Sequence, residues 1–358
     1  MGLEDPGMPS QPKEARNYLL ACYAVSLIQG GTILGTPIRH QTVVNYLTAA
    51  YKLLRDRKLR FDSKEDYVAI ILKALNSYED VADRRNMITD GMTRWFVDQS
   101  KLEGPDSAMS AITDWIILGR YAGFRSSEWC QTTQSSYARI DKWPGTPSLA
   151  FTRDDFTFSG ANERRLTEDD IRHLDFTHIH HLNVRWRKQK NDENGQKIDF
   201  ACDNVNPEFC PVRAARRIYL RSIRQQGPAH EPIATFASKT GARKFITSVM
   251  VAAHLRKAAS TVLHINEGDK SLNLWSTHSI RVTAANLLHR ANLSDSYIQT
   301  RLRWKSDSFL MYLRNTIYAA DAHTKAININ LGHKESANAS YRATKEPHET
   351  LLSTMRAQ

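Results

Sequence analysis

Apolar positions recur at helical spacing through the first hundred residues. Val43, Leu47 and Leu54 fall on one helix face, because residues three or four apart in a helix lie side by side. Residues 1–12 are polar and proline-rich, and we predict that they are disordered. The helical patterns in this part of the chain cover residues 43–54, 66–76 and 87–97. Residues 13–103 are therefore predicted to form a helical domain.

The pattern changes after Gly104-Pro105, a dipeptide typical of a linker. Apolar and polar residues now alternate, which predicts strands with one buried face. Asn194-Gly195 favours the tight turn of a hairpin between two such strands. The predicted strands cover residues 148–158, 178–187 and 196–200. The second domain should thus contain a small antiparallel sheet.

Helical spacing returns after the hairpin, beginning with Pro211 in a first helical turn. The later predicted helices cover residues 247–261, 277–290, 294–302 and 307–317. We expect a mainly α fold with a small antiparallel β-sheet, the α+β class. The second domain is predicted to span residues 104–335, with a tail over residues 336–358.

Composition and net charge indicate what class of protein this is and what kind of partner it binds. The 358 residues are 41% hydrophobic, and no apolar run reaches the roughly 20 residues that a membrane helix needs. The N-terminus lacks the apolar core of a signal peptide, so we expect an intracellular protein with no membrane contact. The net charge is +11, nearly all of it in residues 104–358. This surplus fits DNA or RNA as partner, although scattered surface lysines would give the same total.

Cysteine and histidine spacing does not favour a metal site. The four cysteines form no CxxC pair and are interpreted as reduced, packed thiols. Four histidines lie close together in the strand region, but alternation places neighbouring strand residues on opposite faces. The residues concerned are Cys22, Cys130, Cys202 and Cys210, and His173, His178, His180 and His181. We expect no bound metal.

Two basic clusters are candidates for contact with phosphate groups. The first follows the Val43 helix, and the second forms a one-sided stripe at helical spacing after Pro211. The clusters are Arg55, Arg57, Lys58 and Arg60, and Arg213, Arg217 and Arg221 with Arg224. Each of them is also compatible with a solvated helix surface, so both interpretations stay open.

Four short segments carry residue types suited to phosphodiester chemistry. They are residues 123–129 (GFRSSEW), 189–192 (QKND), 277–281 (THSIR) and 303–314 (RWKSDSFLMYLR). Breaking a phosphodiester requires a nucleophile, fixed cations for the non-bridging oxygens and a proton for the leaving oxygen. Guanidinium suits the oxygens because it binds them in a fork and stays charged.

The third segment is arranged to meet an anion. His278 and Arg281 lie three residues apart, so both project from one face of a first helical turn if Thr277 caps that helix. The N-terminal end of a helix also favours negative charge.

In order and spacing, these residues resemble the active-site set of the tyrosine recombinases, the phage-integrase family. His278-Ser279-Ile280-Arg281 is similar to the HxxR motif, and Gly123-Phe124-Arg125 with Glu128 to the first Arg box. Lys190 precedes the hairpin turn, Trp304 stands where members have His or Trp, and Tyr312 stands at the nucleophile position. The resemblance covers about residues 13–330, including a helical DNA-clamping domain over residues 13–103.

The resemblance implies a role for each matching residue. Tyr312 would attack the scissile phosphate to form a 3′-phosphotyrosyl bond and free a 5′ hydroxyl. Arg125 and Arg281 would hold the non-bridging oxygens. His278 would assist proton removal from Tyr312 or bind the phosphate, and Lys190 would protonate the leaving 5′ oxygen.

Two further residues would support this chemistry. Trp304 would pack the site and offer its indole N–H as a donor, and Glu128 would position its neighbours. Two departures from the family pattern are visible. The interval from Trp304 to Tyr312 is one residue shorter than in many members, and Leu302-Arg303 replaces the usual Leu-Gly.

The resemblance further implies a site-specific DNA recombinase or integrase, including the transposon type, that needs no metal, nucleotide or other cofactor. Its expected partner is double-stranded DNA, bound by a homotetramer that holds two sites. It would be found with DNA, in the nucleus of a eukaryote or in the cytoplasm or nucleoid of a bacterium. The alternatives are a catalytically inactive DNA-binding relative and an enzyme similar to type IB topoisomerases.

Overall fold

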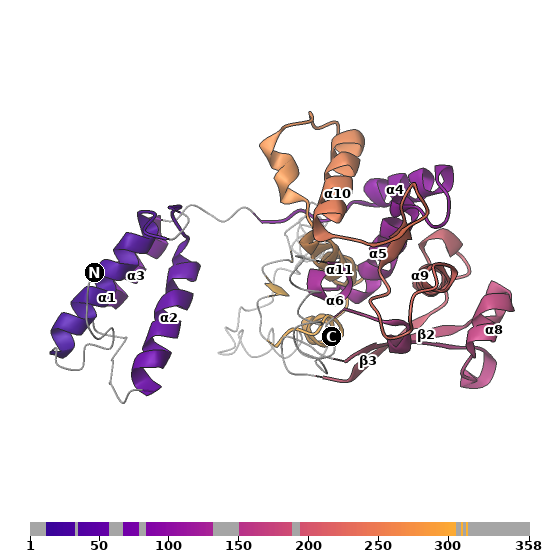
Figure 1. Cartoon of the computed structure of the whole chain (residues 1–358), viewed down its shortest axis with the longest axis horizontal. Helices are drawn as coiled ribbons and strands as arrows, with labels where there is room; N and C mark the ends of the chain where they lie inside the picture. Colours follow the sequence, from indigo (N-terminus) through magenta and orange to yellow (C-terminus); the bar gives the residue numbers. More distant parts are fainter. Residues whose placement is uncertain are drawn as a thin grey trace, which may run out of the picture. The chain divides into compact units, whose positions relative to one another are not determined.

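The structure is a computed structural model that describes residues 12–32, 35–56, 67–78, 84–131, 150–187, 194–305, 309–310 and 313. The chain divides into two compact units, Met1–Asp83 and Arg84–Gln358 (Figure 1). The architecture is mainly helical with small antiparallel sheets, which confirms the predicted fold class.

The first unit consists of helices in its described part. Val43 and Leu47 are buried in its core together with Leu20 and Ala24, which confirms the apolar stripe predicted from spacing. The helices are α1 (Lys13–Ile28), α2 (His40–Asp56) and α3 (Tyr67–Tyr78). Helix α1 packs against both α2 and α3.

The division between the units falls earlier in the chain than the Gly104-Pro105 linker predicted. Helix α4 (Asp90–Leu102) belongs to the second unit, where it packs on α5 (Ala108–Ala122). Met92 and Phe96 of α4 are fully buried in the same core as Trp115 of α5. Gly104-Pro105 is thus a turn between two packed helices of one unit.

The second unit continues with short strands and helices around α5. Its helices are α6 (Ser126–Trp129), α8 (Glu168–His173), α9 (Pro211–Arg224), α10 (Ser248–Leu263), α11 (His278–Arg290) and α12 (Asp295–Arg301). Its strands are β1 (Phe156–Ser159), β2 (His181–Trp186), β3 (Gln196–Ala201), β4 (Thr235–Ala237) and β5 (Arg243–Phe245). Helix α5 contacts α4, α9 and α11, so it is the central element of this unit.

The predicted hairpin is present as the antiparallel pair β2 and β3 (Figure 1). Strand β1 pairs with the other side of β2, so the order in the sheet is β1-β2-β3. Leu182, Val184 and Trp186 alternate inward and are buried, as the sequence pattern predicts. Trp186 pairs with Gln196, so residues 187–195 join the strands and not the two-residue turn at Asn194-Gly195 that the sequence predicts; at the base of this connection Gly195 N donates to Trp186 O at 2.7 Å.

Aromatic side chains join the sheet to α5. Trp115 stacks on Trp129 with ring centroids 5.0 Å apart, and Phe151 meets Trp186 edge-on at 5.2 Å. Phe124, which follows α5, contacts both Trp115 and Trp186. Burial of such rings is a large stabilising contribution, and it fixes the segment that contains Arg125.

Candidate active site

The first site segment begins at a tight turn after α5. Gly123 ends the helix in the left-handed region, with φ of +57°. A Cβ atom at this position would lie 2.7 Å from Leu302 Cδ2, so the backbone approaches the Leu302 segment more closely than other residues allow. The turn places Arg125 at the start of α6, with Glu128 one turn later.

Glu128 is the carboxylate around which the site is organised. Its side chain is 4% exposed and accepts hydrogen bonds from the Arg125 backbone N at 2.9 Å and Arg125 Nη1 at 3.0 Å. It also accepts from Trp186 Nε1 at 3.2 Å and from Arg303 Nη2 at 3.0 Å. Burial opposes its ionisation, but Arg303, the Arg125 backbone N–H and the Arg125 charge outweigh burial and lower the pKa. Glu128 is therefore a buried anion held by cations.

The second guanidinium comes from α11. Arg281 is 3% exposed and donates from Nη1 to Gly123 O at 2.6 Å and from Nη2 to Leu302 O at 2.8 Å. Its guanidinium lies 4.6 Å from the centre of the Trp304 ring. Such stacking holds the plane of the guanidinium in one orientation. Arg125 donates in turn from Nη2 to Arg303 O at 3.2 Å.

Helix α11 begins at His278, but the side chain of Ser276 and not that of Thr277 caps it. The Thr277 side chain makes no capping hydrogen bond, whereas Ser276 Oγ accepts from the His278 backbone N at 3.3 Å. Ser279 N donates to Ser276 O at 2.8 Å, which closes the first turn. His278 and Arg281 still lie one turn apart on this helix.

His278 is half-buried at the start of α11. Burial, with the positive charges of Arg281 and Arg85, lowers its pKa to about 4. The imidazole is therefore neutral near pH 7 and is able to accept a proton or a hydrogen bond.

Of the residues predicted for catalysis, Arg125, Arg281 and Trp304 are brought together with the supporting Glu128, and His278 lies one turn away. Lys190 and Tyr312 lie outside the described residues, as do Arg57, Lys58, Arg60 and the Arg55 side chain. Their assigned roles stay predictions.

A cavity of about 720 Å³ opens beside this cluster. Trp304 and Lys305 line one part of it, and Asn194 and Gly195 line another. These residues belong to the segment after α12 and to the hairpin turn between β2 and β3.

Arg303 is a site residue that the sequence reasoning did not assign. It is 1% exposed, and its side chain reaches Glu128, while its carbonyl oxygen accepts from Arg125. The sequence signal for Arg303 was the replacement of the usual Leu-Gly by Leu302-Arg303. Arginine is almost never fully buried unless it is paired, and the partner of Arg303 is Glu128. The described hydrogen bonds thus place two guanidiniums, those of Arg125 and Arg303, on the carboxylate of Glu128.

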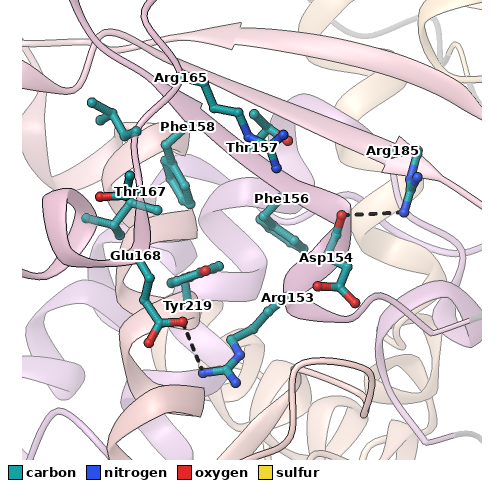
Figure 2. A pocket seen from close by; sticks show the side chains of 12 residues that line it. Arg153, Asp154, Phe156, Thr157, Phe158, Arg165, Thr167, Glu168, Arg185 and Tyr219 are labelled. Atoms are coloured by element: carbon teal, nitrogen blue, oxygen red, sulfur yellow. Dashed lines mark hydrogen bonds and ion pairs between the residues drawn. The ribbon is translucent and has the colours of Figure 1, made fainter.

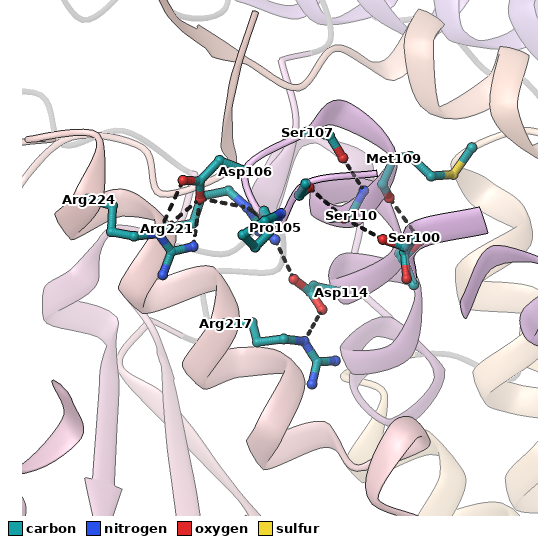
Figure 3. A network of polar contacts seen from close by, with 12 residues as sticks. Ser100, Pro105, Asp106, Ser107, Met109, Ser110, Asp114, Arg217, Arg221 and Arg224 are labelled. Carbon is teal, nitrogen blue, oxygen red and sulfur yellow. Dashed lines mark hydrogen bonds and ion pairs between the residues drawn. The ribbon is translucent and has the colours of Figure 1, made fainter. Parts of the chain in front are cut away.

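The predicted basic stripe on α9 has a structural role in this chain (Figure 3). Arg221 is 2% exposed and donates from Nη2 to Asp114 at 2.6 Å, so it is not accessible to DNA. Arg217 donates from Nε to the same carboxylate at 2.6 Å, and Arg213 donates to Asn204 at 3.0 Å. The phosphate-contact interpretation does not hold for Arg221, because its charge joins α9 to α5.

A second cavity, of about 580 Å³, lies between β1, α8 and α9 (Figure 2). Arg153, Arg165 and Arg185 line it together with Asp154 and Glu168. Arg153 Nη1 lies 3.9 Å from the Glu168 carboxylate, so cations and anions alternate on the walls. Among the described residues, none of those predicted for catalysis lines this cavity.

The described parts of the chain lack two kinds of feature. In these ranges no helix is long and apolar enough to cross a membrane. Nor do three or more His, Cys, Asp or Glu side chains come together there in a way that would hold a metal ion.

No family model and no curated protein matches the sequence. The chain is similar to solved structures of DNA-bound tyrosine recombinases. A lambda integrase dimer bound to a COC′ core site is 14% identical, over 88% of this chain and 83% of the other, with a TM-score of 0.43. The Tn1549 transposon integrase with transposon right end DNA is 12% identical, over 87% and 85%, with a TM-score of 0.47. XerH bound to palindromic difH is 14% identical, over 88% and 72%, with a TM-score of 0.47.

Proposed function

We propose that this chain is a tyrosine recombinase that cleaves and rejoins DNA through a covalent 3′-phosphotyrosine at Tyr312. The observation that carries the proposal is the convergence of Arg125, Arg281 and Trp304 from three separate segments of the chain, with His278 one turn away. Hydrogen bonds to buried groups hold both guanidiniums in fixed orientations. Such preorganised cations suit a phosphate that gains charge in its transition state.

The proposed reaction is a transesterification at one phosphorus atom. The bond between the Tyr312 phenolic oxygen and phosphorus forms as the bond to the 5′ oxygen of DNA breaks. Lys190 donates a proton to the leaving 5′ oxygen, and His278, neutral near pH 7, accepts the phenolic proton. Attack by a 5′ hydroxyl from another strand reverses the step and rejoins DNA.

Arg125 and Arg281 bind the non-bridging oxygens in this proposal. Because Glu128 fixes one edge of Arg125 and two carbonyls fix Arg281, neither guanidinium has to reorganise when the phosphate arrives. Trp304 covers one face of Arg281, which keeps water from it.

The partner that fits this site is double-stranded DNA. The +11 net charge favours the polyanion, and phosphate contacts would give most of the affinity. Exchange between two duplexes requires several copies of the enzyme, and we propose a homotetramer on two sites. Lambda integrase has been solved as a tetramer on a Holliday junction.

Trapping of the covalent intermediate tests the proposal. The substrate is a pool of nicked random-sequence duplexes. After cleavage the strand that carries the 5′ hydroxyl is lost, so rejoining is blocked and the wild-type protein should accumulate as a denaturation-resistant protein–DNA complex. Tyr312→Phe should abolish the complex and leave DNA binding intact, because only the nucleophile is removed. Tyr297→Phe, at an exposed position on α12, is the matched control and should trap DNA as the wild type does.

The outcomes separate the candidate functions. Binding of DNA with no trapped complex in the wild type would contradict an enzyme and favour a DNA-binding relative. Relaxation of supercoiled DNA without resolution of a Holliday junction would favour a topoisomerase. Resolution of the junction supports the recombinase.

A further inference from the structure

Arg303 occupies an unusual position between α12 and Trp304. It is buried, and its backbone has φ of +60°, in the left-handed region where a side chain is sterically unfavourable. Glycine adopts this conformation without cost, so another interaction must stabilise arginine here. The contacts of its side chain identify that interaction.

The left-handed turn at Leu302-Arg303 supports both proposed phosphate-binding residues. The Leu302 carbonyl accepts from Arg281 Nη2 at 2.8 Å, and the Arg303 carbonyl accepts from Arg125 Nη2 at 3.2 Å. Two consecutive peptide carbonyls thus orient two guanidiniums that come from different helices. A change in the backbone of this turn would move both of them.

The Arg303 side chain points back into the unit and fixes the turn. Its Nη1 donates to Ala122 O at 3.1 Å, and its Nη2 donates to Glu128 Oε2 at 3.0 Å. Its guanidinium lies 3.9 Å from the centre of the Trp186 ring. These contacts join the turn to the end of α5, to α6 and to β2.

The same contacts control the charge of Glu128. This carboxylate also accepts from Arg125 through the backbone N and Nη1, so Arg125 and Arg303 share one anion. If Arg303 were neutral, the full attraction of Glu128 would act on Arg125 and compete with a phosphate for it. Burial lowers the pKa of Arg303 to about 10, with Glu128 opposing that effect, so Arg303 is still protonated near pH 7.

We propose that Arg303 is a positioning residue, which orients Arg125 and Arg281 through its turn and neutralises Glu128 so that Arg125 is available to the scissile phosphate. This inference rests on the proposed function and adds to it a residue that acts through others. It predicts an effect on the cleavage step itself, whereas a purely stabilising ion pair would affect only folding.

The test combines two substitutions that separate backbone from charge. Arg303→Gly keeps the left-handed turn but removes the guanidinium, and Glu128→Gln removes the anion that Arg303 neutralises. We expect Arg303→Gly to lower the rate of covalent trapping on the nicked duplexes by about 100-fold, a loss similar to that of one transition-state donor. Its dissociation constant for DNA should change by less than about threefold, because most affinity comes from other phosphate contacts.

The double variant Arg303→Gly/Glu128→Gln should recover about tenfold in rate relative to Arg303→Gly, since the uncompensated anion is gone. Arg303→Lys, which keeps the charge but loses the fork, should fall between wild type and Arg303→Gly. Arg221→Met removes an equally buried arginine from the Asp114 pair and is the matched control for lost stability. It should lower the melting temperature and leave the trapping rate of the folded protein unchanged.

Each outcome decides the proposal. A wild-type trapping rate in folded Arg303→Gly would overturn the role of Arg303 while the proposed function stands. If the loss of trapping rate in every Arg303 variant matched the fraction of that variant that is unfolded, the role of Arg303 would also be overturned. Arg303 would then contribute only to stability. Failure of the wild type to trap DNA would overturn both.

Discussion

Two clusters of arginines in the second unit differ in the groups that accept their hydrogen bonds. On α9, Arg217 and Arg221 donate to Asp114, and Arg224 donates to Asp106 at 2.6 Å (Figure 3). Each guanidinium of that cluster has a carboxylate partner. The charges largely cancel, and the cluster joins α9 to the start of α5.

In the candidate site the partners are mostly peptide carbonyls. The described hydrogen bonds of Arg281 end on Gly123 O and Leu302 O, while Arg125 and Arg303 share Glu128. A carbonyl orients a guanidinium but does not cancel its charge.

The comparison shows that burial of arginine alone does not mark a functional site. Arg221 of the α9 cluster is as fully buried as Arg281 and Arg303 of the site. What separates them is the acceptor among the described contacts: carboxylates accept from all three α9 arginines, whereas peptide carbonyls accept from Arg281 and, together with Glu128, from Arg125 and Arg303.

Arg281→Lys should give the largest difference between the clusters. Lysine keeps the charge but cannot bridge Gly123 O, Leu302 O and a phosphate with one rigid fork. We expect the rate of covalent trapping to fall roughly 100- to 1000-fold, with little change in DNA affinity. Single-turnover trapping with excess protein measures the rate separately from binding.

Arg221→Lys is the control from the α9 cluster. It should lower stability, because Asp114 keeps only part of its hydrogen bonding, and leave the trapping rate of the folded protein within about twofold. An equal loss of rate in both variants would end the distinction between a structural and a functional cluster.

The sequence predicted the elements of the fold better than their grouping. Helical and alternating spacing located most helices and the β2–β3 hairpin, since periodicity is a local property. It did not show that α4 packs with α5, because an apolar helix face does not reveal which neighbour will cover it. The predicted domain ends at residue 103, whereas the first compact unit ends at Asp83.

The site residues that lie in short sequence motifs were predictable. Gly123-Phe124-Arg125 and His278 with Arg281 were found from spacing, and the structure brings the two arginines to neighbouring carbonyls. Arg303 was missed because its role depends on a left-handed φ and on Glu128, 175 residues away in sequence. The stripe containing Arg221 left two interpretations open, because its partner Asp114 is 107 residues earlier.

The arginines near His278 also predict a pH effect. Its pKa of about 4 lies below the ordinary value of 6.5, because burial and two nearby guanidiniums disfavour the imidazolium. Between these values the unfolded chain binds a proton that the folded chain does not, so stability falls as pH decreases. His278→Gln should remove about 2 kcal/mol of this loss between pH 7.5 and 5.

Urea unfolding of wild type and His278→Gln at both pH values measures this difference. The free energy of unfolding should decrease less in the variant as the solution is acidified. The same decrease in both proteins would mean that the imidazole is not held neutral by the site, and the contrast in charge between the two clusters would lose its support.

The smallest expected effect concerns the salt dependence of DNA binding. Arg217 donates its Nε to Asp114 and is only 37% exposed, so Arg217→Gln should leave the slope of log affinity against log salt unchanged. Lys305 is exposed beside Trp304 at the edge of the site cavity, and Lys305→Gln should reduce the slope by about 0.9, the value of one phosphate contact. Fluorescence anisotropy with a labelled duplex over a salt series measures both. A reduced slope for Arg217→Gln would show that DNA competes with Asp114 for this arginine, and the α9 cluster would then contribute to the DNA-binding surface.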